Sequence, residues 1–380
     1  MAGSGVPDLN MKKKNVARVA HTFYLLCLVA ALLGTACSQK KTREKQVSQE
    51  KKAAPPPPVE SFTTSREYTS FGAEHYAAWQ AQVPEVKNIG LPSSIDGHVD
   101  SVLFYTSASR KKKPLLVVLH SWSTTYLQQA SIPFALWAME KDCVFVSPNY
   151  RGIFDHPEAM ASDLALQDIM DAVAYAKKQA HVDTTRIYVV GSSGGAMTAL
   201  VAAGKHPDTW AGVMAWVPVF DIAAWYKWNS YFPIRKYNGQ MEAALGGNPL
   251  TNAKAAAEAR RRSPVTYISG AREVPIFLAH GILDELVQPE HSIRAFNMLA
   301  KPKDRITPWQ IKYILKHKAL PGDLVGATDS TYFRKTDPKV VFIRESNNVR
   351  LVLFEGVHDM VYNPGLLWLE QQQRRPAGQR

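Results

Sequence analysis

Short apolar runs that alternate with helix-patterned segments constrain this chain more than any other feature. Between two of these runs, residues 162–180 carry apolar side chains at helical spacing, with Ser162 as the expected N-cap. Strands that are apolar at consecutive positions are typical of a sheet that is buried on both faces. The alternation predicts the α/β class, with a mostly parallel central sheet flanked by helices. The runs are "PLLVVLHSW", "CVFVSPNYRG", "RIYVV", "GVMAWVPVF", "VPIFLAHG" and "VRLVLFEGVHD".

Composition fits one large folded body and gives no sign of a nucleic-acid partner. The chain has 380 residues, is 46% hydrophobic and carries a net charge of +12. About half of that charge lies in the first 60 residues, so the remainder is only mildly basic. Because no recognition motif accompanies the charge, we expect no binding to nucleic acid.

The first 37 residues resemble a bacterial lipoprotein signal peptide. Lysines 12–14 and Arg18 precede an apolar run over residues 23–33, and small residues then lead to Cys37, the expected site of lipidation. Gly34 stands where an aliphatic residue is usual, and an uncleaved anchor is the alternative. Residues 38–60 are polar and end in four prolines, which predicts a disordered tether. The folded body is expected over 61–380.

The stretch "IYVVGSSGGAMTALVAAG" places a serine-glycine turn between a strand and a helix. Ser193 is the centre of a G-x-S-x-G pattern, and the strand before it and helix after it are the setting of a nucleophile elbow. Gly191 and Gly195 suit positions where a side chain would meet the crossing backbone. The N–H of Gly194 is expected to point at a developing oxyanion. The alternative is a glycine-rich turn with incidental serines.

A nucleophilic serine requires a base and a group that orients the base. Asp284 follows the strand "VPIFLAHG", and His358 follows the strand "VRLVLF", so both are predicted at the same sheet edge as Ser193. Glu285 is the rival to Asp284. His280 and His291 compete with His358, but His280 is expected to be a buried structural histidine.

The loop "HSWSTTY" after the first central strand should supply the second oxyanion donor. The backbone N–H of Trp122 or of Ser121 is the candidate. The indole of Trp122 could instead shield the site.

Several of these segments together resemble the catalytic domain of the prolyl oligopeptidase family, an α/β-hydrolase group. The resemblance covers roughly residues 98–300 and the strand and loop around His358. It implies the α/β-hydrolase fold, with Ser193 as nucleophile, Asp284 as acid and His358 as base. The segments that carry it are "PNYRG", "GSSGGAMTALVAAGKHPDTWAGVMAWVPVFD" and "VPIFLAHGILDELVQPEHSIRAFNML".

The chain departs from the family pattern in two insertions and in the first oxyanion loop, which reads "HSWS" where glycines are common. An insertion at about 301–346 lengthens the interval between acid and base, and we expect a helical flap or side subdomain there. The other insertion, at about 222–262, comes first along the chain and is called the first insertion below; it is rich in aromatic residues. As a cap it could bind substrate through Trp225, Trp228 and Tyr231, or these side chains could simply form its core.

The sequence therefore predicts a serine hydrolase of the prolyl oligopeptidase type that cleaves an ester or peptide bond through an acyl-enzyme. A carboxylesterase for acylated carbohydrates or small esters is the alternative, and a non-catalytic tethered binding protein is the second alternative. The chemistry needs no metal ion and no organic cofactor. The expected location is the bacterial cell envelope, on the extracytoplasmic side of a membrane and held there by lipid.

Overall fold

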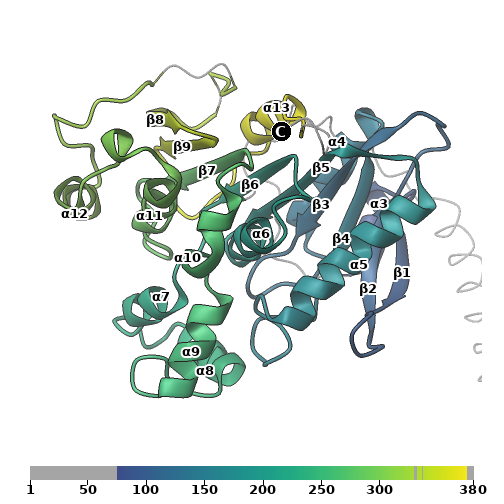
Figure 1. Ribbon diagram of the computed structural model, residues 1–380, viewed down its shortest axis with the longest axis horizontal. Helices are drawn as coiled ribbons and strands as arrows, with labels where there is room; N and C mark the ends of the chain where they lie inside the picture. The colour runs from purple at the N-terminus through teal and green to yellow at the C-terminus, as the bar shows by residue number, and fades with distance from the viewer. Residues whose placement is uncertain (1–74, 329–331, 336, 375–380) are drawn as a thin grey trace, which may run out of the picture. The chain divides into compact units, whose positions relative to one another are not determined.

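The computed structural model describes residues 75–328, 332–335 and 337–374, which contain one nine-stranded sheet (Figure 1). The strand order is β1-β2-β4-β3-β5-β6-β7-β9-β8. The strands are β1 (Lys87–Pro92), β2 (Val99–Tyr105), β3 (Lys113–Leu119), β4 (Val144–Pro148), β5 (Val182–Ser192), β6 (Gly212–Trp216), β7 (Ile276–Gly281), β8 (Val340–Ser346) and β9 (Val349–Phe354).

The centre of the sheet is parallel, and its two margins are antiparallel. Strands β4, β3, β5, β6, β7 and β9 pair in parallel, whereas β1, β2 and β8 run antiparallel to their neighbours. The prediction of a mostly parallel sheet is therefore confirmed. The carboxyl ends of the parallel strands meet at one edge, and all three residues predicted for the triad follow strand ends there.

Helices cover both faces of the sheet, and each face has its own apolar core. The helices α5 (Asp163–Gln179), α6 (Gly194–Lys205) and α11 (Glu290–Leu299) pack on one face. The helices α3 (Tyr76–Gln82), α4 (Ile132–Glu140) and α13 (Tyr362–Glu370) pack on the other. Short helical segments link these elements, namely η2 (Gln129–Ser131), α10 (Pro264–Tyr267) and η3 (Ile268–Ala271).

Strand β3 shows why the central runs are apolar at every position. Leu115, Val117 and Leu119 join the core on the first face, while Leu116 and Val118 join the core on the second. Successive side chains of a strand point to opposite faces, so a strand covered on both sides needs apolar residues throughout. Helix α5 begins as predicted, because the Ser162 side chain accepts a hydrogen bond from the backbone N–H of Ala165 and so caps the helix.

The two segments that were expected to be insertions both contain described elements, and the later segment includes a strand that was not expected. Between β6 and β7 the chain forms α7 (Ile222–Asn229), α8 (Tyr237–Leu245) and α9 (Ala253–Arg262), which group together in Figure 1. Residues 301–346 form η4 (Pro302–Asp304) and α12 (Pro308–His317) and then end in strand β8, which extends the sheet. The sequence analysis did not predict this edge strand. Within the described residues, no helix combines the length and apolarity needed to cross a bilayer.

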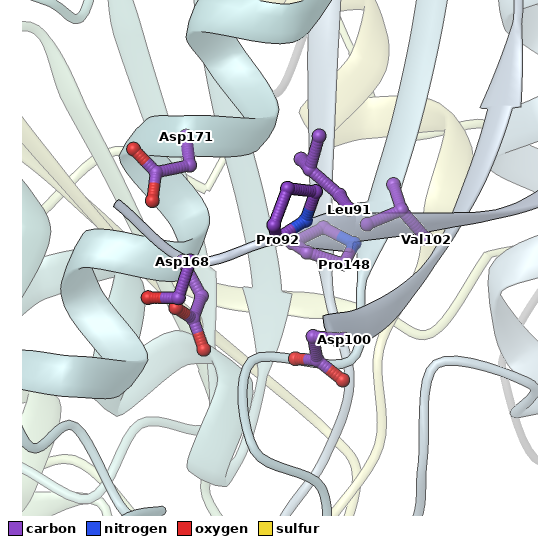
Figure 2. A pocket seen from close by; sticks show the side chains of 8 residues that line it. Leu91, Pro92, Asp100, Val102, Pro148, Asp168 and Asp171 are labelled. Atoms are coloured by element: carbon purple, nitrogen blue, oxygen red, sulfur yellow. The ribbon is translucent and has the colours of Figure 1, made fainter. Parts of the chain in front are cut away.

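A buried arginine ties the turn after β4 to its surroundings. Arg151 lies in this turn with a φ of 74°, and its guanidinium pairs with Asp168 of α5 at 2.5 Å and with Asp96 at 2.9 Å. Its backbone N–H donates to Asp100 of β2. The hydrogen bond from Arg151 lowers the pKa of Asp96 to about 2. The neighbouring pocket, in which Asp100, Asp168 and Asp171 lie with Pro92 and Pro148, is shown in Figure 2.

This arginine network also supports the loop after β3. Tyr150, next to Arg151, donates its hydroxyl to the carbonyl of His120 at 2.5 Å and stacks on the His120 ring at 4.2 Å. His120 is fully buried, and one of its ring nitrogens contacts the carbonyl of Asn149 at 2.8 Å. The turn after β4 therefore braces the loop in which the sequence analysis placed an oxyanion donor.

We expect Arg151→Met to lower the free energy of unfolding by roughly 3–5 kcal/mol, because it leaves the buried Asp168 carboxylate without its counter-charge. Urea unfolding followed by circular dichroism measures this change. Arg261→Met is the matched control, since Arg261 pairs with Asp163 and Glu258 near the surface and should cost about 1 kcal/mol or less. Equal losses in the two variants would contradict the assignment.

Candidate active site

Ser193 occupies a strained turn at the end of β5. Its φ is 56° and its ψ is −118°, a backbone conformation that residues other than glycine rarely adopt. It is the N-cap residue of α6, its backbone N–H donates to the carbonyl of Trp216 at the end of β6, and it is 9% exposed. The predicted strand-to-helix elbow is therefore present, with Ser193 at its apex.

The glycines around Ser193 permit contacts that no side chain would allow. A Cβ atom on Gly191 would lie 2.3 Å from the carbonyl carbon of Gly195. A Cβ atom on Gly195 would lie 2.4 Å from the carbonyl oxygen of Leu119. Real Cβ atoms do not approach other atoms so closely, so both positions require glycine.

The backbone of Gly194 lies against that of Trp122, and this brings the two predicted oxyanion donors together. A Cβ atom on Gly194 would stand 2.9 Å from the backbone nitrogen of Trp122. The N–H of Ser121 already donates to the side chain of Gln128 at 2.9 Å. The N–H of Trp122 has no acceptor among the described residues, which favours Trp122 over Ser121 as the second donor.

The Trp122 side chain is buried beside this pair of backbone groups. Its ring packs edge-on against Phe154 and against Trp225 of the first insertion. Its indole N–H finds no partner among the described residues, although the side chain is only 2% exposed. The indole therefore packs between Phe154 and Trp225 of helix α7.

Asp284 is fully buried and its carboxylate is held by four groups. One oxygen accepts the backbone N–H of Leu286 at 2.8 Å and that of Val287 at 3.0 Å. The other lies 2.7 Å from Nδ1 of His358 and 3.2 Å from Nε2 of His280. Burial alone would raise the pKa of Asp284, but the two histidines hold this pKa well below its usual range. Asp284 is therefore a carboxylate at neutral pH.

His358 lies on the loop after β9 with one ring nitrogen on Asp284. Because Nδ1 contacts the carboxylate, Nε2 is the nitrogen left to face a substrate or a serine. Among the described residues, no hydrogen bond joins the Ser193 hydroxyl to His358. Such bonds are often long before substrate binds. Backbone bonds from Ile282 to Phe354 and from Leu283 to Gly356 fix the Asp284 loop against the His358 loop.

The competing histidines have structural roles. His280 is fully buried, as predicted, and its ring contacts the Ser292 hydroxyl at 2.7 Å and the carbonyl of Val287 at 2.8 Å. His291 is buried within α11 rather than lying on an open helix face. Its Nδ1 accepts the backbone N–H of Phe220 at 3.0 Å. Burial lowers the pKa of His291 to about 3, so its ring is neutral.

The three aromatic residues predicted to bind substrate differ in exposure. Trp225 is 1% exposed and packs in the core, which agrees with the second of the two expected alternatives for this side chain. Trp228 is half-buried, with its ring against Phe232 and Tyr231. Tyr231 is 66% exposed and is the one of the three with a ring open to a ligand. The Trp225 ring packs against Trp122 and Tyr237, and its indole N–H donates to the carbonyl of Leu286, which accounts for its burial.

Two predictions concern residues or groups that the geometry here does not test. Cys37 and the tether at 38–60 lie outside the described residues. Within the described residues, no cluster of histidine, cysteine, aspartate or glutamate could hold a metal ion. Among the described residues the one cysteine is Cys143, which is buried, and burial raises its pKa to about 12.

The fold and this arrangement of residues define an α/β-hydrolase. A family model described as the prolyl oligopeptidase family matches residues 134–323. The chain belongs to that family and is a serine hydrolase.

The chain is also similar to individual proteins, one matched by sequence and two by structure. YfhR of Salmonella typhi, an uncharacterised protein, is 21% identical over 230 residues, which cover 58% of this chain and 72% of YfhR. An acylaminoacyl peptidase solved with Z-Gly-Gly-Phe-chloromethyl ketone superposes with a TM-score of 0.51 at 16% identity, covering 77% of this chain and 42% of that one. The acylaminoacyl peptidase of Pyrococcus horikoshii is 19% identical, with a TM-score of 0.46, over 56% of this chain and 34% of its own. The chain thus spans about a third to two fifths of these solved structures.

Protonation of His291 should destabilise the fold in acid. The unfolded chain takes up a proton on this residue near pH 6.5, whereas the folded protein does so only near pH 3. Stability is therefore intact above pH 6.5 and is lost as the pH falls toward 3, by up to about 1.4 kcal/mol per pH unit. Urea unfolding between pH 4 and 7 should show a shallower slope for His291→Gln, and identical slopes would contradict this cause.

Proposed function

We propose that Ser193, Asp284 and His358 form the catalytic triad of this hydrolase. The observation that carries the proposal is the 2.7 Å contact between Nδ1 of His358 and the buried Asp284 carboxylate, at the sheet edge where Ser193 sits in its strained turn. Asp284 fixes the tautomer of His358 and stabilises its cationic form. This leaves Nε2 of His358 to accept a proton.

In the proposed reaction, the Ser193 hydroxyl attacks the carbonyl carbon of the substrate while Nε2 of His358 takes the hydroxyl proton. The N–H groups of Gly194 and Trp122 stabilise the oxyanion of the tetrahedral intermediate, and each such donor typically contributes roughly 10²–10³ in turnover. His358 then protonates the leaving group as its bond to the acyl carbon breaks. Water then attacks the acyl carbon while Nε2 of His358 takes a proton from it. His358 returns this proton to the Ser193 oxygen as the bond to the acyl group breaks and the acid product leaves.

For the substrate class, we favour a peptide or a peptide-like amide. Membership of the prolyl oligopeptidase family supports this choice. An acylaminoacyl peptidase with a similar fold was solved with a peptidyl chloromethyl ketone. The aromatic insertion supports an ester of a small alcohol or sugar as the second candidate. Of its residues, we propose Tyr231 as a substrate contact because its ring is exposed. Hydrolysis rates on peptide anilides and on aryl or sugar acetates separate the two classes.

We also propose that the protein is a lipoprotein of the bacterial envelope, held at Cys37 on the extracytoplasmic side of a membrane. The cationic start, the apolar run and the small residues before Cys37 support this proposal.

The triad proposal is tested by labelling the full chain with a fluorophosphonate and measuring its intact mass. We expect one adduct on the wild type and none on Ser193→Ala. Asp284→Asn and His358→Ala should slow labelling by roughly 10⁴-fold, since each disrupts the same proton transfer. Ser192→Ala is the matched control and should label normally. A folded wild-type protein that takes no adduct would favour the tethered binding protein instead.

The anchor proposal is tested by growing cells with labelled palmitate and separating membranes. The wild type should carry label and sediment with membranes, whereas Cys37→Ser should carry none. Membrane association of Cys37→Ser without loss of the first 36 residues would favour an uncleaved apolar anchor.

A further inference from the structure

Three side chains from the first insertion donate hydrogen bonds to the loop that carries Asp284. The indole N–H of Trp225 donates to the carbonyl of Leu286 at 2.9 Å. The indole N–H of Trp228 donates to the carbonyl of Glu285, also at 2.9 Å. The guanidinium of Arg235 donates to the same Glu285 carbonyl at 3.2 Å. The insertion thus contacts the two backbone carbonyls that follow the acid.

These carbonyls belong to the same peptide units that bind the carboxylate. The N–H of Leu286 shares a planar peptide group with the Glu285 carbonyl, and it donates to Asp284 at 2.8 Å. The N–H of Val287 shares a peptide group with the Leu286 carbonyl and donates to the same oxygen at 3.0 Å. In a trans peptide the C=O and N–H point in opposite directions and turn as one body. Each unit is therefore held at its oxygen by the insertion and at its N–H by Asp284.

The Asp284 carboxylate depends on these two peptide N–H groups because it is buried. The carboxylate is fully buried, and the titratable groups that face it are His280 of β7 and His358 of the loop after β9. Among the described residues, no lysine or arginine contacts it directly, and Arg235 is linked to it through the Glu285–Leu286 peptide group. Hydrogen bonds in such a chain polarise one another, so a donor on the carbonyl strengthens the N–H bond to the carboxylate.

We propose that Trp225, Trp228 and Arg235 are positioning residues, which orient Asp284, and through it His358, by fixing these two peptide units. The inference rests on the triad proposed above. It makes the insertion a working part of the catalytic machinery, joined to the acid loop rather than only covering the site. A ligand that moves Tyr231 or Phe232, which pack on Trp228, would act on the acid loop through the same contacts.

The test measures the kinetics of fluorophosphonate inactivation of the full chain, separating the maximal rate, kinact, from the half-saturating concentration, KI. Trp228→Phe keeps a ring but removes the donor. Arg235→Met removes the guanidinium, which donates to the Glu285 carbonyl and also lies over the Phe232 ring. We expect each to lower kinact by roughly 3- to 10-fold with KI unchanged. The double variant should lose more than either alone.

Trp309→Phe on α12 is the matched control, because that tryptophan is 58% exposed and contacts Tyr313 rather than the acid loop. It should keep the wild-type kinact. An unchanged kinact in the double variant overturns the inference, and so does a raised KI at constant kinact, which would make Trp228 a substrate contact. If Trp228→Phe fails to fold, Arg235→Met alone decides in the same way. Failure of the wild type to label would refute the proposed triad itself, which is a separate outcome.

Discussion

Helix α6 crosses the ends of β3 and β5 at a distance that excludes even one Cβ atom, and the geometry of the site depends on this crossing. The carbonyl of Leu119 would lie 2.4 Å from a side chain at position 195. The close approach forces the chain to reverse sharply at Ser193, and this residue adopts a positive φ of 56°. It also brings Gly194 against the backbone of Trp122, so the proposed nucleophile and the proposed oxyanion donors are placed by one packing constraint.

A second constraint acts on the acid side of the site, where a fully buried carboxylate must remain charged. Asp284 meets this demand with two backbone N–H groups and two imidazoles. The backbone groups are themselves held by indoles from helix α7. Burying a charge is tolerated only when its hydrogen-bonding capacity is filled. The first insertion therefore holds the peptide groups whose N–H groups bind this buried carboxylate on the loop after β7.

The Trp122 loop and the His358 loop both follow strands of the sheet, and contacts outside the site hold the Trp122 loop in place. The buried Arg151 fixes the turn that carries Tyr150, and Tyr150 in turn supports the loop of Trp122 through His120. On the other side, β9 and its neighbour β8 carry the loop of His358. Membership of the prolyl oligopeptidase family makes this chain a serine hydrolase.

The sequence alone determined the parallel sheet, the elbow at Ser193, the order of acid and base, and the structural role of His280, because these follow from local pattern and strand order. It did not predict β8, whose pairing with β9 is an edge contact between segments with ordinary composition. A substrate-binding aromatic residue and a core aromatic residue look alike in a sequence, so both roles were left open for Trp225, which the structure buries. The choice of Trp122 over Ser121 needed the position of Gln128, and the support of Asp284 needed the position of Trp228. Only the tertiary structure decided these points, because they depend on which hydrogen-bond donors are already paired across distant parts of the chain.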